Sequence, residues 1–349
     1  MNRKYRFILK TMVIATIPLT VPVALYFICD PFKVLRTYDD YFADGLSVNK
    51  GVVTASTFEA ENPAHHYDSF ILGSSISCYY EADNWKKFLE PGARPFHFDT
   101  SNQPIRTLRR TVEYLERNAY SLRNILIVLD PFIFRLQPDK TDMVFIDPPQ
   151  IRKEWWYKTF FHYKMISHFL NVKYLVSYLP WLYSKEKRSY CDTNIFEPQP
   201  ITWDRITNEE HVYSWDDSIS HCPEIFYARH PIGCEPKPYN SSKENLINKD
   251  IEEDMRTIAV ILNRNGCNYK VVISPNLRRE VLNECDDRIM RNIFGHNYHN
   301  LGRDFHAAMT DHTNFYDNTH YRASLAGQIM QKIYAGTDIE NMNRLFLND

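Results

Sequence analysis

Short apolar runs that alternate with helix-patterned segments constrain the fold of this 349-residue chain more than any other feature. Each run has the length and the β-branched or aromatic content of a buried strand. The runs are Ser69–Leu72, Arg94–Phe98, Asn124–Leu129 and Tyr269–Ile273. Between them, Ile105–Arg117 and Ile251–Leu262 place apolar residues at helical spacing. Because strands that alternate with helices pair in parallel, we expect an α/β fold, a three-layer α/β/α doubly wound parallel sheet with its ligand crevice at the carboxyl ends of the strands.

The overall composition fits a globular protein and argues against a nucleic-acid binder. Hydrophobic residues make up 44% of the chain and charged residues 24%, which is enough apolar material for one large core. The formal net charge is only −2, and the sequence holds no long run of Lys or Arg. The positive surface that nucleic acid requires is therefore not expected, and nucleic acid is excluded as a partner.

The N-terminus carries the pattern of a membrane anchor. Basic residues, from Arg3 to Lys10, precede an uncharged and mostly apolar stretch, Thr11–Cys29, that is about long enough to cross a bilayer. A cleaved signal peptide is the alternative, but the stretch lacks a small-residue cleavage site at its end. We expect a single-pass transmembrane helix in the cell membrane, with the rest of the chain extracytoplasmic, in the periplasm or at the cell surface. Disulfides are allowed there, and Cys222 with Cys234 is the first pair to test.

The alternation of strands and helices is interrupted by a long segment rich in aromatic residues, which we interpret as an insertion or cap. Its aromatic side chains are expected to pack between helices, and a surface that stacks on sugar rings is the alternative. The predicted parts are a cytoplasmic tail and anchor (1–30), a membrane-proximal connector (31–65), the first part of the α/β domain (66–137), the insertion (138–250) and the second part of the domain (251–349).

A candidate nucleophile follows the first predicted strand. The strand runs into Gly73, Ser74 and Ser75, which places a hydroxyl group at its carboxyl edge, where Gly73 permits a tight turn. The same three residues are also common in a simple turn that caps a helix. The segment predicts a reactive serine only if a base is found elsewhere in the chain.

A candidate base lies near the C-terminus, just before a predicted helix at 322–334. Asp317 and His320 are three residues apart, so one loop can present the imidazole while the carboxylate fixes its tautomer. Helix capping by Asp317 is one alternative. Metal binding is another, because Asp311 and His312 lie nearby, although no helical pair of histidines supports it.

Taken together, these two segments resemble the SGNH (GDSL-like) hydrolase superfamily. Its first block is Gly-Asp-Ser after the first strand and its last is Asp-x-x-His before the final helix, which match Gly73-Ser74-Ser75 and Asp317–His320 here. The resemblance implies a flavodoxin-like fold, with Ser75 rather than Ser74 or Ser77 as the nucleophile. Ser74 replaces the family's Asp, Asn102 stands where its second block has Gly, and the third block is missing, with Asp130 ending that strand instead. The Ser75 amide and the Asn102 side chain would then hold the oxyanion, and Gly73 and Ser74 are the other residues expected in the oxyanion and substrate-binding site.

These departures, with the predicted anchor, are similar to those of membrane-anchored extracytoplasmic SGNH-like proteins of polysaccharide or teichoic acid O-acylation. The resemblance implies a serine esterase or O-acyltransferase that acts on acyl esters, in the first place acetyl esters, of surface or exported glycans without a cofactor or metal. A multi-pass membrane O-acyltransferase is the implied protein partner. The alternative is a non-catalytic glycan-binding or scaffold protein, which the missing third block favours. Cys78 is expected to pack rather than to react.

Overall fold

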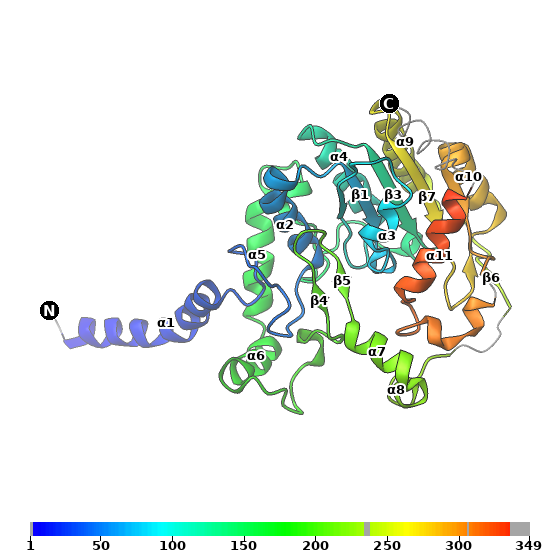
Figure 1. The fold of residues 1–349 in the computed structure, drawn as a ribbon. Coiled ribbons are helices and arrows are strands. Elements are labelled where there is room, and N and C mark those ends of the chain that lie inside the picture. Colours follow the sequence, from blue (N-terminus) through cyan, green and yellow to red (C-terminus); the bar gives the residue numbers. More distant parts are fainter. Residues whose placement is uncertain (1–2, 234–237, 306, 336–349) are drawn as a thin grey trace.

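A parallel sheet of five strands forms the centre of the molecule (Figure 1). The computed structural model describes residues 3–233, 238–305 and 307–335. The strand order is β2-β1-β3-β7-β9, and every neighbouring pair is parallel. The strands are β1 (Ser69–Gly73), β2 (Pro95–His97), β3 (Asn124–Leu129), β7 (Asn268–Ile273) and β9 (Tyr298–Asn300). In this doubly wound order, β2 lies on one side of β1 and the later strands lie on the other. A ligand crevice is therefore expected between the carboxyl ends of β1 and β3, where the strand order changes direction.

Helices cover both faces of the sheet. Because side chains alternate between the two faces along a strand, one strand can contribute to an apolar cluster on each face. Phe70 and Leu72 pack in one apolar cluster, whereas Ile71 between them packs in the other. The first cluster includes side chains of α2 (Lys50–His65), α4 (Ile105–Arg117), α9 (Lys249–Arg264) and α10 (Glu284–Phe294). The second includes side chains of α3 (Ala82–Lys86) and α11 (Ala323–Tyr334). The predicted α/β architecture with a parallel sheet is confirmed, and the four predicted strands and three predicted helices lie where expected.

The predicted connector at 31–65 differs from the structure, because its second half is helix α2, which belongs to the domain. Phe58 is fully buried and contacts the rings of Phe70, Phe96 and Phe98. The helix begins at Asn49, whose side chain accepts the backbone N–H of Val52. Its buried positions include Lys50, Thr54 and Thr57 as well as apolar residues. This mixture of polar and apolar residues on the buried side hides the helical periodicity in the sequence.

In its described residues, the segment between β3 and α9 holds four α-helices and three short strands. These are α5 (Tyr157–Phe169), α6 (Val172–Ser184), β4 (Thr202–Trp203), β5 (Glu210–His211), α7 (Tyr213–His221), α8 (Pro223–Arg229) and β6 (Asn240–Ser241), which pairs with β8 (Glu280–Val281). In Figure 1, α5 and α6 lie to the left of the sheet, α7 and α8 below it, and β6 to its right. Most of its aromatic side chains are packed, as expected, and Tyr157, Phe161, Tyr178 and Trp181 are buried in one apolar cluster. Short 3-10 helices lie at Ile133–Arg135, Pro149–Ile151, Thr193–Ile195, Gly295–Asn297, Ala308–Thr310 and His312–Asn314.

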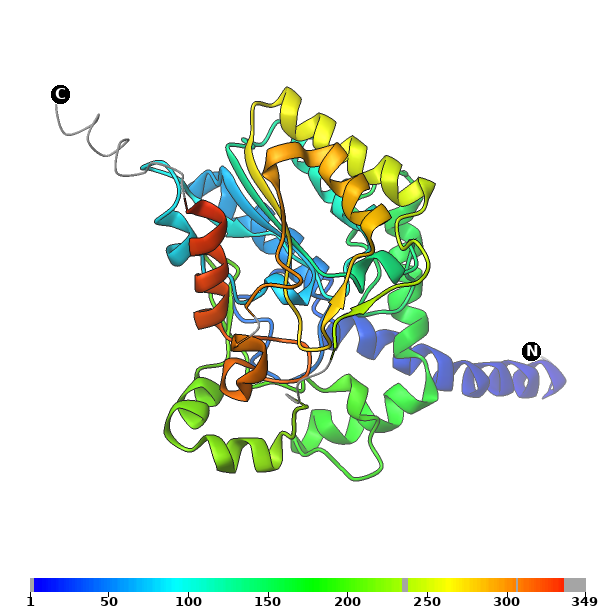
Figure 2. The same cartoon turned by 90° about the vertical axis from the view of Figure 1, so that its right-hand side faces the viewer.

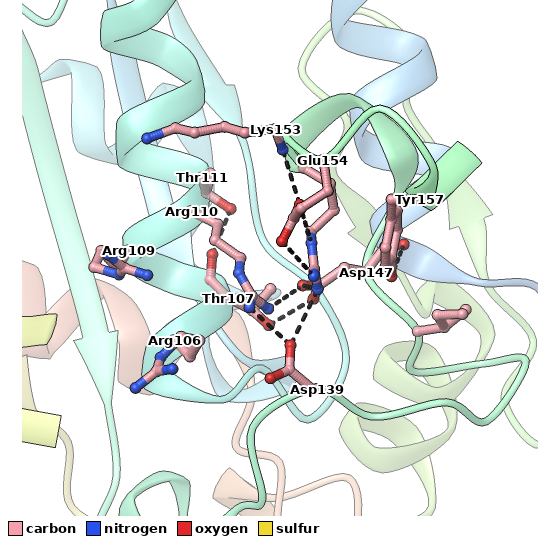
Figure 3. Close-up of polar contacts among 12 residues, drawn as sticks. Arg106, Thr107, Arg109, Arg110, Thr111, Asp139, Asp147, Lys153, Glu154 and Tyr157 are labelled. Atoms are coloured by element: carbon pink, nitrogen blue, oxygen red, sulfur yellow. Dashed lines mark hydrogen bonds and ion pairs between the residues drawn. The ribbon is translucent and has the colours of Figure 1, made fainter. Parts of the chain in front are cut away.

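Buried ion pairs fasten the start of this segment to α4 (Figure 3). The carboxylate of Asp147 accepts hydrogen bonds from Thr107 Oγ1 at 2.6 Å, Arg110 Nη1 at 2.6 Å and Arg152 Nη1 at 3.3 Å. Asp139 contacts the same two guanidinium groups at 2.7 and 3.0 Å. The side chain of Asp147 is only 5% exposed, so its charge is neutralised by protein rather than by water.

We expect Asp147→Ala to lower the free energy of unfolding by about 3 kcal/mol, because it removes a buried carboxylate that pairs with Arg110 and Arg152 and accepts the Thr107 hydroxyl. Urea unfolding followed by circular dichroism measures this loss. Asp147→Asn, which keeps the shape and an acceptor for Thr107, is the matched control and should lose less. Equal stability of the Ala variant and the wild type would show that the network does not hold the insertion in place.

The N-terminal helix α1 (Arg3–Cys29) projects away from the rest of the molecule (Figures 1 and 2). The helical conformation that we expected here is present, and the following residues re-enter the domain, where Phe32 packs with α5 and α6. Among the described residues, no helix combines the length and the mean hydropathy needed to cross a membrane, so the predicted transmembrane helix is not supported. The predicted pairing of Cys222 with Cys234 involves residue 234, which lies outside the described residues.

Candidate active site

The first strand delivers the predicted nucleophile to the sheet edge through a glycine turn. A Cβ atom at Gly73 would collide with the carbonyl oxygen of Val128 on β3, so only glycine allows the two strand ends to approach this closely. The next residue, Ser74, starts the 3-10 helix Ser75–Ser77. Ser75 therefore lies at the carboxyl ends of β1 and β3, in the crevice that the strand order predicts.

The three neighbouring serines have different environments, and only Ser75 has the one expected of a nucleophile. Ser77 is fully buried, and its backbone N–H and its hydroxyl both donate to the Ser74 carbonyl oxygen, at 2.9 and 2.7 Å. Ser74 is 8% exposed. Ser75 is half-buried and lines two cavities that His320 also lines. These positions agree with the choice of Ser75 over its neighbours.

Asp317 and His320 interact as their spacing predicts. A bridge between Phe315 and Tyr321 closes the loop that holds them. One carboxylate oxygen of Asp317 accepts the backbone N–H groups of Thr319 and His320, at 2.6 and 2.8 Å. The other oxygen lies 2.8 Å from His320 Nδ1. This geometry fits a tautomer with the proton on Nδ1, which leaves the lone pair on Nε2.

The electrostatic setting keeps Asp317 ionised. Burial raises the pKa of this carboxyl group, but the hydrogen bond and charge of His320, together with the two backbone amides, outweigh burial and hold the pKa below its usual range. His320 Nε2 is buried and has no hydrogen-bond partner among the described residues. A nitrogen with a free lone pair beside a serine-lined cavity is the arrangement that a general base requires.

The first cavity, of about 310 Å³, brings the remaining predicted residues to the site. Ser74, Ser75, Asn102 and His320 all line it. Asn102 reaches it because the chain beyond β2 continues to pair with β1, with the Thr100 N–H donating to the Gly73 carbonyl oxygen at 3.2 Å. Gly73 forms the turn rather than the cavity wall. The structure thus places Asn102 close enough to Ser75 to share a bound ligand with it.

Asp130 lies on the wall of the same cavity, at the end of β3. Its carboxylate accepts the Ile133 backbone N–H at 3.1 Å, which supports the structural role that we expected. Burial raises the pKa of this carboxyl group, and the neighbouring charge of Glu280 adds to the effect. Asn276 and Arg278, from the loop after β7, complete the polar wall. The sequence analysis missed both, because nothing in that loop marks them as different from surface residues.

A buried charge cluster lies behind Ser75 and was also missed. Lys50 Nζ lies 2.6 Å from Glu210 and 3.8 Å from Asp99, and the Cys78 thiol donates to Asp99 at 3.2 Å. Burial raises the pKa of Asp99, but the charges of Lys50 and His97 outweigh it and lower the pKa. Burial and Asp99 raise the pKa of the Cys78 thiol well above its usual value, so it stays protonated, in agreement with a packing role. The position of Asp99, directly after a strand at the ligand edge, was the available signal.

Gln199, from the insertion, supports the Asp317 carboxylate. Its Nε2 donates to Asp317 at 3.3 Å, and its Oε1 accepts the Tyr79 hydroxyl at 2.9 Å. The Tyr79 ring in turn contacts the His320 ring edge-on, at 6.2 Å between centroids. Gln199 therefore connects the insertion to the predicted catalytic pair as a positioning residue.

We expect Gln199→Leu to lower kcat for a small ester by about tenfold, because the hydrogen bond that Gln199 donates to the Asp317 carboxylate is lost. Steady-state kinetics on an aryl acetate provide the measurement. Gln199→Asn, which retains the amide, should recover part of the rate if its shorter side chain reaches Asp317. A rise in KM with unchanged kcat would instead assign Gln199 to substrate binding.

The four residues that were considered as metal ligands make other contacts in the structure. Asp311 caps a short turn, accepting the backbone N–H and the hydroxyl of Thr313 at 2.9 and 2.7 Å. His312 packs edge-on against the ring of Tyr227. Within residues 3–233, 238–305 and 307–335, no three His, Cys, Asp or Glu side chains converge as metal ligands. Asp317 and His320 are engaged with each other instead.

Comparison with known proteins does not assign the chain to a family. No protein-family model matches it, and no curated protein matches it.

Proposed function

We propose that this protein is a serine esterase or O-acyltransferase in which Ser75, His320 and Asp317 form the catalytic triad. The observation that carries the proposal is the 2.8 Å contact between His320 Nδ1 and Asp317, with Nε2 left unpartnered among the described residues in a cavity wall that includes Ser75. A fixed tautomer, a free lone pair and a nearby hydroxyl are the components of nucleophilic acyl transfer.

In the proposed reaction, Ser75 Oγ attacks the carbonyl carbon of an ester, and its proton passes to His320 Nε2. The electron pair of the carbonyl bond moves to the oxygen, and the Ser75 backbone N–H and the Asn102 side chain stabilise the resulting oxyanion. When the intermediate collapses, the bond to the alcohol breaks, and His320 returns the proton to the departing oxygen. Water or a sugar hydroxyl then attacks the acyl carbonyl carbon while His320 Nε2 takes its proton. When the ester bond to Ser75 breaks, His320 returns the proton to Ser75 Oγ. Asp317 stabilises the imidazolium that forms each time.

The SGNH assignment is part of this proposal. Its support is the position of the two motifs at the edge of the sheet and the strand order, which is that of flavodoxin-like doubly wound folds. The resemblance also supplies the proposed substrate class, acyl esters of surface or exported glycans. A multi-pass membrane O-acyltransferase is the proposed partner. No cofactor is required by these steps.

Trapping of the acyl-enzyme tests the proposed function. The full chain should react with a fluorophosphonate, and peptide mass analysis should place the adduct on Ser75. It should also release a burst of the alcohol from an activated aryl acetate before steady turnover. If neither reagent modifies the protein while it still binds an acetylated glycan, the non-catalytic scaffold function replaces this proposal.

We propose further that α1 and α6 attach the protein to a membrane, with the site on the extracytoplasmic side. The projecting α1 and its exposed Phe27 and Ile28 support attachment (Figure 2). Along α6, Val172, Val176 and Leu179 form an exposed apolar stripe, which suits a helix that lies at the surface of a bilayer. The exposed basic side chains of Lys173, Lys185, Lys187 and Arg188 flank the stripe and favour anionic lipid headgroups.

We expect the full-length protein to stay in the membrane fraction after a high-salt wash and to be released only by detergent. A tag placed after Asp349 should be accessible from outside the cytosol. Leu179→Glu is expected to weaken binding to anionic vesicles, whereas Glu224→Gln, a change on exposed α8, should not. Recovery of the unmodified chain in the soluble fraction would overturn the proposed attachment.

A further inference from the structure

A second cavity, of about 230 Å³, opens on the other side of the catalytic pair. Ser75 and His320 line it as they line the first cavity. Its remaining walls come from segments far apart in the sequence: the N-terminal segment at 42–50, the turn at Cys78 and Tyr79, and the insertion at 144–145, 197–201 and 210. The N-terminal segment and the insertion therefore form much of the wall of the second cavity, which extends to Ser75 and His320.

The two cavities differ in whether residues beside the proposed oxyanion line them. Asn102 and Ser74, beside the proposed oxyanion, line the first cavity, whereas among the described residues neither lines the second. The acyl carbonyl must lie next to the oxyanion donors, and the alcohol oxygen must lie next to His320 Nε2, which returns its proton. With the acyl group in the first cavity, the alcohol extends into the second.

Acidic side chains outnumber basic ones around the second cavity. Glu197 and Glu210 line it together with Lys50. Lys50 is already paired with Glu210 at 2.6 Å and lies 3.8 Å from Asp99. Burial raises the pKa of Glu197 to about 7, and Glu210 adds to this effect while Lys50 opposes it. With Asp99 next to Lys50 and Lys187 near Glu197, three carboxyl groups and two ammonium groups surround the second cavity, which leaves an excess of negative charge when all of them are ionised.

We propose that this second cavity is the alcohol subsite of the enzyme, and that it accepts neutral or positively charged alcohols and rejects anionic ones. The inference rests on the proposed acyl-transfer function and adds its substrate class: esters and acceptors whose alcohol part is an uncharged or amino-bearing sugar. A sugar carrying a carboxylate or phosphate near the acylated hydroxyl would bring a second negative charge into a partly desolvated site, which is unfavourable.

Three acetate esters with matched aryl leaving groups test the proposal, because hydrolysis and transfer both release the alcohol. The para substituents are hydroxymethyl, which is neutral, trimethylammoniomethyl, which is cationic, and carboxymethyl, which is anionic. We expect kcat/KM, corrected for the uncatalysed rate of each ester, to be at least about tenfold lower for the anionic ester than for the other two. Equal values, or preference for the anion, would overturn the subsite.

Glu197→Gln provides the decisive variant. It removes one charge but keeps an oxygen that can accept the Gln199 backbone N–H, as Glu197 does at 3.3 Å. The ratio of cationic to anionic ester rates should fall severalfold. Glu186→Gln, an equal charge change on an exposed residue of the insertion, should leave the ratio unchanged. The same ratio in both variants would contradict the inference.

Ionisation of Glu197 gives an independent measurement. Between about pH 6 and pH 8 the wild-type ratio should increase as this carboxyl group loses its proton, and the increase should vanish in Glu197→Gln. Protonation of His320 affects all three esters alike and cancels in the ratio. Glu210, Lys50 and Lys187 influence the pKa of Glu197, and the titratable side chains of Cys78, Tyr79 and His320 line the same cavity. Failure of the wild type to hydrolyse any ester would instead count against the proposed function itself, and the inference would fall with it.

Discussion

Ser75→Ala is expected to lower esterase activity by at least about 10⁴-fold and to abolish labelling by a fluorophosphonate, because it removes the hydroxyl group that forms the covalent ester in the proposed mechanism. The residual rate would come from oxyanion donors and binding alone. Activity on an aryl acetate and in-gel fluorescence of the labelled protein provide the two measurements. Ser75 occupies a half-exposed turn, so the change to alanine should leave the fold intact.

Ser77→Ala and Ser74→Ala are the controls for this experiment. Ser77→Ala removes a hydrogen bond to the Ser74 carbonyl oxygen and should cost about 1 kcal/mol of stability while it retains most of the labelling. Ser74→Ala should also retain much of it, since Ser74 is a wall residue. Undiminished labelling of Ser75→Ala, or its loss only in Ser77→Ala, would move the nucleophile away from Ser75.

The sequence predicted the geometry of the candidate site where short stretches of chain determine it. Gly73 and Ser75 are fixed by the end of one strand, and Asp317 and His320 by one loop, so local spacing was sufficient. The strands were predicted for the same reason, because β3 is a buried apolar run from Ile125 to Leu129 and β7 ends in the buried β-branched residues Val271, Val272 and Ile273. Their parallel order follows from the helices between them.

What the sequence did not predict depends on contacts between distant segments. Lys50 meets Glu210 across 160 residues, and Gln199 meets Asp317 across 118. No periodicity relates such pairs, and a lysine or glutamine in a polar stretch looks like a surface residue until the fold buries it. The helix α2 was missed because buried Lys50, Thr54 and Thr57 interrupt its apolar pattern. The features that were not predicted are therefore the contacts through which the insertion and the N-terminal segment complete the site.

The second large effect concerns the base and its orienting carboxylate. His320→Ala should remove nearly all turnover, because His320 Nε2 accepts the Ser75 proton in the proposed mechanism. Asp317→Asn should keep the fold but lower activity by up to about 10⁴-fold, since an amide donating to Nδ1 would move the imidazole proton to Nε2 and block the lone pair. Rates on an aryl acetate, with circular dichroism to verify folding, measure both. Asp311→Asn, whose carboxylate only caps a turn, is the matched control and should remain active.

Acid should inactivate the wild type through the imidazole and not through the carboxylate. The pKa of Asp317 is lowered in the folded protein, so its carboxylate stays ionised at pH values where an ordinary carboxyl group takes up a proton. The stability that this shift contributes is present above the usual carboxyl pKa and is lost as the pH falls through the lowered pKa. The proposed mechanism requires a neutral His320 to accept the Ser75 proton, so we expect activity to be lost at a higher pH than the stability that Asp317 contributes. A pH–rate profile, read beside a pH–stability profile, separates the two events. Full activity in His320→Ala, or activity that disappears with a chelator and returns with added metal, would contradict the triad and favour a metal-dependent reaction.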